Sequence, residues 1–175
     1  VIGMHWSNPP HIIPVIEVIQ GAQTNDATVA ATHALVKTIE MIPVDVLKDV
    51  AGFVENRILY AIMREALHLV ESGIATAEAV DTITKWGIGY KLSVIGPMEL
   101  LDMAGLDIYA SVASYLNADL SNETGVSSAI TDKVDAGILG LKTGGGLYEY
   151  GEGEIPGLMA KRIQMLLDVK KVLNS

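Results

Sequence analysis

The sequence has no cysteine and few basic residues, and both absences narrow what the protein can be. Without cysteine it forms neither disulfides nor thiolate metal sites. With four scattered histidines and no His-x-x-x-His pair, a metal centre is not expected either. The 12 lysines and arginines are outnumbered by 21 acidic residues, and the resulting net charge of −9 argues against binding to nucleic acid or to an anionic membrane surface.

Long hydrophobic runs and targeting signals are also missing. No apolar run approaches the roughly 18 residues that span a bilayer, and nothing resembles a signal peptide, so a cytoplasmic protein is expected. Half of the 175 residues are nevertheless hydrophobic, and only 19% are charged. This composition predicts a packed core, with enough chain for one domain and part of a second.

The chemically informative stretch is the first twenty residues, VIGMHWSNPPHIIPVIEVIQ. Residues 1–6 and 14–20 predict two short strands, because they are rich in valine and isoleucine and the prolines between them exclude a helix. Glu17 interrupts the second strand, where burying an unpaired carboxylate costs several kcal/mol. His5 on the neighbouring strand is the nearest candidate partner. A carboxylate on one imidazole nitrogen fixes the tautomer and leaves the other nitrogen as a base.

Each of these residues also has an ordinary interpretation. A histidine beside a turn is often only structural, and a glutamate on a strand often faces solvent. Neither His5 nor Glu17 alone therefore establishes a function.

The rest of the chain predicts mostly helices. Asp26 can cap a helix that runs to about Met41, and 44–47 is a candidate for a third short strand. Gly52 precedes a long helical pattern over 53–72, whose apolar stripe is too wide for a helix with one buried face. Further elements are expected at 77–86 (helix, capped by Thr76), 87–95 (glycine-bearing loop), 97–104, 106–116, 127–136 and 156–173 (helices) and 147–150 (extended chain).

Four segments, in this order, resemble the motifs of the L-3-hydroxyacyl-CoA dehydrogenase family, and together they cover residues 1 to about 150. They are His5-x-x-Asn8-Pro9 followed by Glu17, Gly52-Phe53-Val54-Glu55-Asn56-Arg57, Gly96-Pro97-Met98-Glu99-Leu100-Leu101-Asp102, and Lys142-Thr143-Gly144-Gly145-Gly146-Leu147-Tyr148.

The resemblance implies a mainly α fold. A helical bundle domain, like the C-terminal domain of 6-phosphogluconate dehydrogenase, would follow a short strand pair left from a Rossmann domain. Residues 1–48 would be the end of the NAD-binding domain, and residues 49–175 the helical domain for substrate binding and dimerisation. The sequence has no G-x-G-x-x-G turn after a strand. It is therefore expected to be part of a larger enzyme and inactive alone, whether through truncation, proteolysis or a separately encoded half.

The implied activity is NAD-dependent oxidation of the 3-hydroxyl of an acyl-CoA to a ketone, as in the β-oxidation of fatty acids, by a homodimer. His5 would be the catalytic base and Glu17 its orienting partner. Asn8 would face the nicotinamide or the substrate, and Asn56 would hydrogen-bond the substrate near the reacting oxygen. Lys142 would approach the cofactor.

Other interpretations stay open. The second proline after Asn8 and the long 87–95 loop look more like the lambda-crystallin (L-gulonate) and carnitine dehydrogenase relatives, whereas 101–107 looks like the acyl-CoA enzymes. The few lysines and arginines provide no evident clamp for the phosphates of CoA. A related hydroxy-acid dehydrogenase, or a non-catalytic helical dimerisation module, remains an alternative. Asn8 could be a turn residue, Asn56 an ordinary first-turn residue and Lys142 a surface cation.

Overall fold

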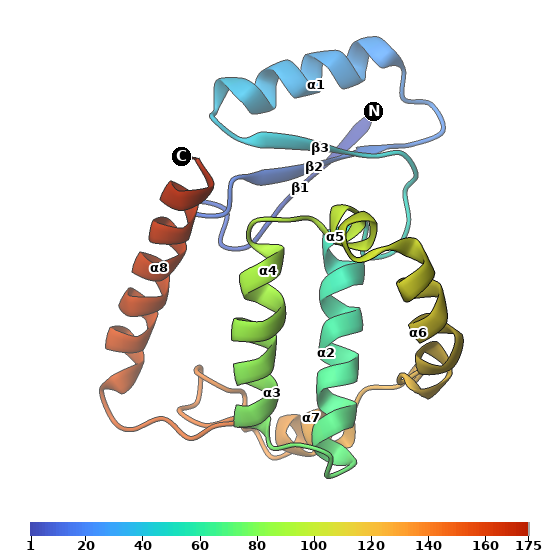
Figure 1. The fold of residues 1–175 in the computed structure, drawn as a ribbon. Helices are drawn as coiled ribbons and strands as arrows, with labels where there is room; N and C mark the ends of the chain where they lie inside the picture. Colours follow the sequence, from blue (N-terminus) through green and yellow to red (C-terminus); the bar gives the residue numbers. More distant parts are fainter. Residues whose placement is uncertain (175) are drawn as a thin grey trace. The chain divides into compact units, whose positions relative to one another are not determined.

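The structure, a computed structural model, describes residues 1–174 and divides into two compact units. The first unit is Val1–Ala61 and the second begins at Ile62. Most of the described residues lie in helices, and the strands form one small sheet in the first unit (Figure 1). The prediction of a mainly α fold with a short strand region at the front is confirmed. Within residues 1–174, every helix is too short or too polar to cross a bilayer.

The sheet has three strands in the order β1-β2-β3. Strand β1 (Ile2–Trp6) pairs antiparallel with β2 (Val15–Gln20), and β2 pairs in parallel with β3 (Ile42–Val46). Both predicted strands at the front are present. The third starts two residues before its predicted position and includes Pro43, which an edge strand tolerates because one side of it makes no ladder hydrogen bonds.

Helix α1 (Asp26–Thr38) follows the sheet's central strand and is capped by Asn25, not by Asp26 as predicted. The Asn25 side-chain oxygen accepts a hydrogen bond from the Thr28 N–H at 2.9 Å, which is the usual N-cap contact. The helix also ends at Thr38, before the expected Met41. Glu40 has a φ of 57° and so leaves the helical region before β3 begins.

The core of the first unit lies between α1 and one face of the sheet (Figure 1). Its fully buried side chains are Ile16 and Val18 of β2 and Val36 of α1. Because side chains alternate along a strand, Glu17 points to the opposite face from Ile16 and Val18. Glu17 therefore lies on the face of the sheet that does not pack against α1.

Helix α2 (Glu55–Glu71) begins two residues later than the pattern predicted. Gly52 and Phe53 have φ values of 77° and 47°, so both lie in the left-handed region and neither can start a right-handed helix. Glycine accepts this conformation without strain, whereas a bulky residue such as Phe53 rarely does. The two residues turn the chain sharply into the first turn of α2.

The second unit contains the remaining helices. They are α3 (Ala77–Ile83), the π-helix η1 (Thr84–Gly89), α4 (Tyr90–Leu92), α5 (Pro97–Ala104), α6 (Leu106–Asp119), α7 (Ser128–Asp135) and α8 (Glu154–Leu173). Thr76 caps α3 and Pro97 opens α5, as the sequence predicted.

The predicted loop over 87–95 is wrong for residues 87–92. Elements α3, η1 and α4 form one helical run that ends at Leu92 (Figure 1). A Cβ at Gly89 would lie 3.1 Å from the Thr84 carbonyl oxygen. Because Gly89 has no side chain, its backbone can approach this oxygen closely at the end of the wide π turn. Gly89 therefore permits close backbone packing inside a helical segment.

Side-chain contacts hold the loops of the second unit in place. Glu71 at the end of α2 accepts hydrogen bonds from the Ser127 hydroxyl at 2.7 Å and from the Ala129 N–H at 3.1 Å, and these lower the pKa of Glu71. Tyr148 donates its hydroxyl to Asp81 at 2.9 Å. Burial together with this acceptor raises the pKa of Tyr148 to about 12, so the phenol stays protonated.

The core assignment predicts that Ile16→Ala will lower the free energy of unfolding of the first unit by about 2–5 kcal/mol, through the lost burial and the cavity that remains. Ile42→Ala on the neighbouring strand is the matched control. Ile42 is 52% exposed, so its truncation costs much less. Urea unfolding of both variants measures the difference, and equal losses would contradict the proposed position of the core.

Candidate active site

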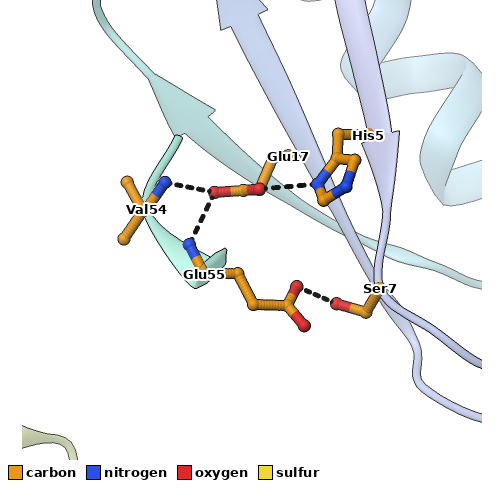
Figure 2. Close-up of polar contacts among 5 residues, drawn as sticks. All are labelled: His5, Ser7, Glu17, Val54 and Glu55. Atoms are coloured by element: carbon orange, nitrogen blue, oxygen red, sulfur yellow. Dashed lines mark hydrogen bonds and ion pairs between the residues drawn. The ribbon is translucent and has the colours of Figure 1, made fainter. Parts of the chain in front are cut away.

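The sheet register places His5 directly opposite Glu17. The two are cross-strand partners in the antiparallel β1–β2 pair, so their side chains leave the same face of the sheet. His5 Nδ1 lies 2.8 Å from Glu17 Oε2 (Figure 2). The separation of 12 residues between them is therefore the length of a hairpin that brings a base and an acid face to face.

The other carboxylate oxygen of Glu17 is held by the start of α2. Glu17 Oε1 accepts hydrogen bonds from the backbone N–H groups of Val54, at 2.8 Å, and Glu55, at 3.1 Å (Figure 2). N–H groups at the start of a helix have no acceptor within the helix, and the helix dipole favours a negative charge there. The 2% exposed Glu17 thus has both oxygens satisfied, which makes its burial affordable.

These contacts determine the charge of Glu17 and the tautomer of His5. Burial by itself raises the pKa of Glu17, but the hydrogen bonds from His5, Val54 and Glu55 outweigh it and lower this pKa below its ordinary value. An ionised carboxylate only accepts hydrogen bonds, so His5 Nδ1 must carry the proton. Nε2 is then the ring nitrogen that can exchange a proton with a substrate.

The environment of the His5 ring suits such an exchange. The ring is about one-third exposed, at 34%, and packs against Phe53 with 5.4 Å between the ring centroids and a tilt of 53°. Phe53 reaches this position because of its left-handed backbone conformation. The Gly-Phe-x-x-Asn-Arg motif is thereby explained: its first residues turn the chain, cover the imidazole and offer N–H groups to Glu17.

Two further polar residues at this site were not predicted from the sequence. Ser7 is 3% exposed and donates its hydroxyl to the Glu55 carboxylate (Figure 2). Ser7 lies between His5 and Asn8, and Glu55 lies immediately before Asn56. Both occupy unspecified positions of the two motifs, so no local signal connected them across 48 residues.

A metal ion does not explain this cluster. Donor atoms of His5, Glu17 and Glu55 lie within 4.8 Å of one another. All three residues, however, already have protein hydrogen-bond partners: Glu17 with His5 and two backbone N–H groups, and Glu55 with Ser7. The arrangement is that of a hydrogen-bonded acid–base pair.

The remaining predicted site residues are dispersed. Asn8 is exposed in the turn after β1, three residues after His5, and Asn56 is half-buried in the first turn of α2, directly after Glu55. Both belong to the first unit. Lys142 is exposed in the glycine-rich hairpin of the second unit, where Gly140 bridges to Gly145. The roles of Asn8, Asn56 and Lys142 remain predictions.

The residues present fit the reacting end of NAD and not its pyrophosphate. An imidazole with one nitrogen free of protein contacts, at the end of a strand whose following turn carries the exposed Asn8, suits a nicotinamide and an alcohol. Within residues 1–174 there is no glycine-rich turn between a strand and a helix of the kind that holds a dinucleotide pyrophosphate.

Comparison with known proteins shows the family of the chain. Residues 52–150 match the family model described as 3-hydroxyacyl-CoA dehydrogenase, C-terminal domain, and residues 1–50 match that of the NAD binding domain of the same family. The chain belongs to the 3-hydroxyacyl-CoA dehydrogenase family. The resemblance seen in the four motifs is confirmed, and so is NAD as the cofactor of this family.

Individual relatives in this family are named after different substrates. A 5-formyl-3-hydroxy-2-methylpyridine 4-carboxylate 5-dehydrogenase of Mesorhizobium japonicum is 54% identical over 99% of this chain and 56% of its own. A crystal structure of an enzyme of this name, described as an NAD⁺-dependent dismutase, has a TM-score of 0.95 at 53% identity, over 99% of this chain and 56% of that one. A probable 3-hydroxybutyryl-CoA dehydrogenase of Deinococcus radiodurans is 37% identical over 85% of this chain and 52% of its own.

The chain thus spans about half the length of the curated relatives that it matches. Its matches to the two family models together cover residues 1–50 and 52–150.

The site geometry predicts that Glu17→Gln will flatten the acid-induced loss of stability of the first unit. A group whose pKa is lowered by folding stabilises the protein above its ordinary pKa, which is 4.5 for Glu17, and this stabilisation is lost as the pH falls through the lower folded value. Urea unfolding at about pH 6 and about pH 3 measures the difference. Glu40→Gln, at an exposed glutamate of the same unit, is the control and should leave the pH dependence unchanged.

Proposed function

We propose that the protein to which this chain belongs is an NAD-dependent dehydrogenase in which His5 is the general base. The observation that supports this most directly is the hydrogen bond of 2.8 Å from His5 Nδ1 to the buried Glu17. It orients the ring and leaves Nε2 for the substrate. Base assistance of this kind typically accelerates a reaction about 10²–10⁴-fold.

Each residue of the site has its own role in this reaction. His5 takes the hydroxyl proton of the substrate through Nε2, and the negative charge of Glu17 stabilises the imidazolium that forms. Asn56 donates its amide to the reacting oxygen, while Asn8 contacts the cofactor side of the site. NAD, when bound, supplies the acceptor for the hydride that leaves the carbon bearing this hydroxyl.

We propose a small pyridine carboxylate carrying an aldehyde as the substrate. The name of the 54% identical relative specifies such a compound, and the likeness to it extends over 99% of the chain. An aldehyde reaches the same chemical step after water adds to it. One hydroxyl of the hydrate gives its proton to His5. NAD⁺, when bound, would accept the hydride from the carbon of the hydrate, so that the products would be a carboxylic acid and NADH.

The second candidate is a 3-hydroxyacyl-CoA, which the motifs alone favoured. It is supported by the match of residues 52–150 to the family's C-terminal domain and by the relatives named 3-hydroxybutyryl-CoA dehydrogenase. Its chemistry at His5 is identical, because a secondary alcohol also loses a proton and a hydride. A related hydroxy-acid substrate of the L-gulonate or carnitine type would use the same step.

Steady-state kinetics of the full-length protein with NAD⁺ can distinguish these substrates. We expect 5-formyl-3-hydroxy-2-methylpyridine-4-carboxylate to be oxidised with a higher kcat/KM than 3-hydroxybutyryl-CoA, measured by NADH absorbance. A higher kcat/KM for the CoA thioester would favour the second candidate. Turnover of neither compound would contradict both substrate assignments.

The role of His5 is tested in the same assay. His5→Ala should lower kcat about 10²–10⁴-fold with the preferred substrate, because the base is lost. His11→Ala is the matched control, since His11 is exposed in the adjoining turn and should leave kcat within about twofold of the wild-type value. If His5→Ala retained wild-type kcat, the proposed function would be wrong.

We further propose that the protein is a homodimer that uses its helical part. None of the α2 side chains, all within the described part of the chain, is buried, and its exposed apolar residues include Ile58, Leu59, Tyr60, Ile62 and Met63. Exposed apolar surface on this scale is typical of interaction sites. Sedimentation equilibrium of the full-length protein should give a dimer, and Tyr60→Glu should shift it towards monomer. A monomeric wild-type protein would contradict this proposal.

A further inference from the structure

The structure joins two residues that the family motifs leave unspecified. Ser7 lies at the second variable position of His5-x-x-Asn8, and Glu55 at the second variable position of Gly52-Phe53-x-x-Asn56. The Ser7 hydroxyl donates to Glu55 Oε2 (Figure 2). This contact connects the turn after β1 with the first turn of α2.

Both ends of the contact are fixed. Ser7 is 3% exposed, and its backbone N–H donates to the Val15 carbonyl at 3.3 Å, which ties it to the start of β2. Glu55 is half-buried, and its backbone N–H donates to Glu17 Oε1 at 3.1 Å. Glu55 therefore contacts Glu17 through its main chain and Ser7 through its side chain.

The second contact adds a constraint that the Glu17 contact lacks. One carboxylate oxygen that accepts two adjacent N–H groups holds the start of α2 near a single point, about which the helix end can still turn. The Ser7–Glu55 hydrogen bond anchors the same turn at a second point, on the hairpin. Each partner directly precedes an asparagine, Asn8 or Asn56, for which the proposed function needs a defined position.

We propose that the Ser7–Glu55 hydrogen bond is a positioning pair, which fixes Asn8 and Asn56 relative to the His5–Glu17 acid–base pair. The inference rests on the proposed function for its kinetic consequence. Ser7 and Glu55 themselves take no proton and contact no reacting atom. They act through the asparagines that follow them, and small misplacements of such groups cost large factors in rate.

A double-mutant cycle in the full-length protein tests the pair. We expect Ser7→Ala and Glu55→Ala each to lower kcat about 10-fold, and the double variant to be no slower than either single one, because all three lack the same hydrogen bond. Glu55→Gln keeps an acceptor oxygen for the Ser7 hydroxyl and should retain kcat within about threefold. Ser7→Cys, with a weaker donor, should fall between serine and alanine.

A readout independent of turnover separates this inference from the proposed function. In ¹H–¹⁵N spectra of the full-length protein, the side-chain amides of Asn8 and Asn56 should shift in Glu55→Ala and return to their wild-type positions in Glu55→Gln. These shifts are expected whether or not His5→Ala abolishes activity.

Two results would overturn the positioning pair. One is additive loss of kcat in the double variant. The other is a purely structural effect, in which the melting temperature falls in Ser7→Ala while kcat stays within twofold of wild type and the amide signals do not move. Either result would leave the His5 test of the proposed function untouched.

Discussion

The buried carboxylate of Glu17 is the interaction on which the rest of the first unit depends. One of its oxygens orients His5, and the other accepts the N–H groups that open α2. A charged group in a central strand is normally unfavourable. Here it connects the two segments that carry the candidate chemistry, so the same contacts that compensate its burial also fix the tautomer of the base.

The elements of the fold could largely be predicted from the sequence, because they follow from local patterns. Their valine and isoleucine content and the prolines between them identified β1 and β2, and Pro97 and Thr76 marked the starts of α5 and α3. The errors arose where tertiary geometry overrides local preference. Gly89 belongs to a π turn because it lets the backbone approach Thr84, and α2 starts late because Phe53 takes a left-handed conformation.

The candidate site could be predicted only in part, for a similar reason. His5 and Glu17 lie on one hairpin, so the cost of burying an unpaired carboxylate and the neighbouring position of the two strands were enough to suggest their contact. The Ser7–Glu55 contact joins residues 48 apart at positions that carry no motif. Substrate choice cannot be read from the acid–base pair either, because a secondary alcohol and a hydrated aldehyde give up the same proton to the same nitrogen.

The most direct test of the account is the protonation state of the His5 ring, observed by ¹⁵N NMR of the full-length protein near neutral pH. In the neutral ring we expect the proton on Nδ1, held by Glu17, and an unprotonated Nε2. In Glu17→Gln this preference should be lost, since an amide can turn a donor towards Nδ1. A wild-type ring with its proton on Nε2 would contradict the account, because that nitrogen could not then act as the base.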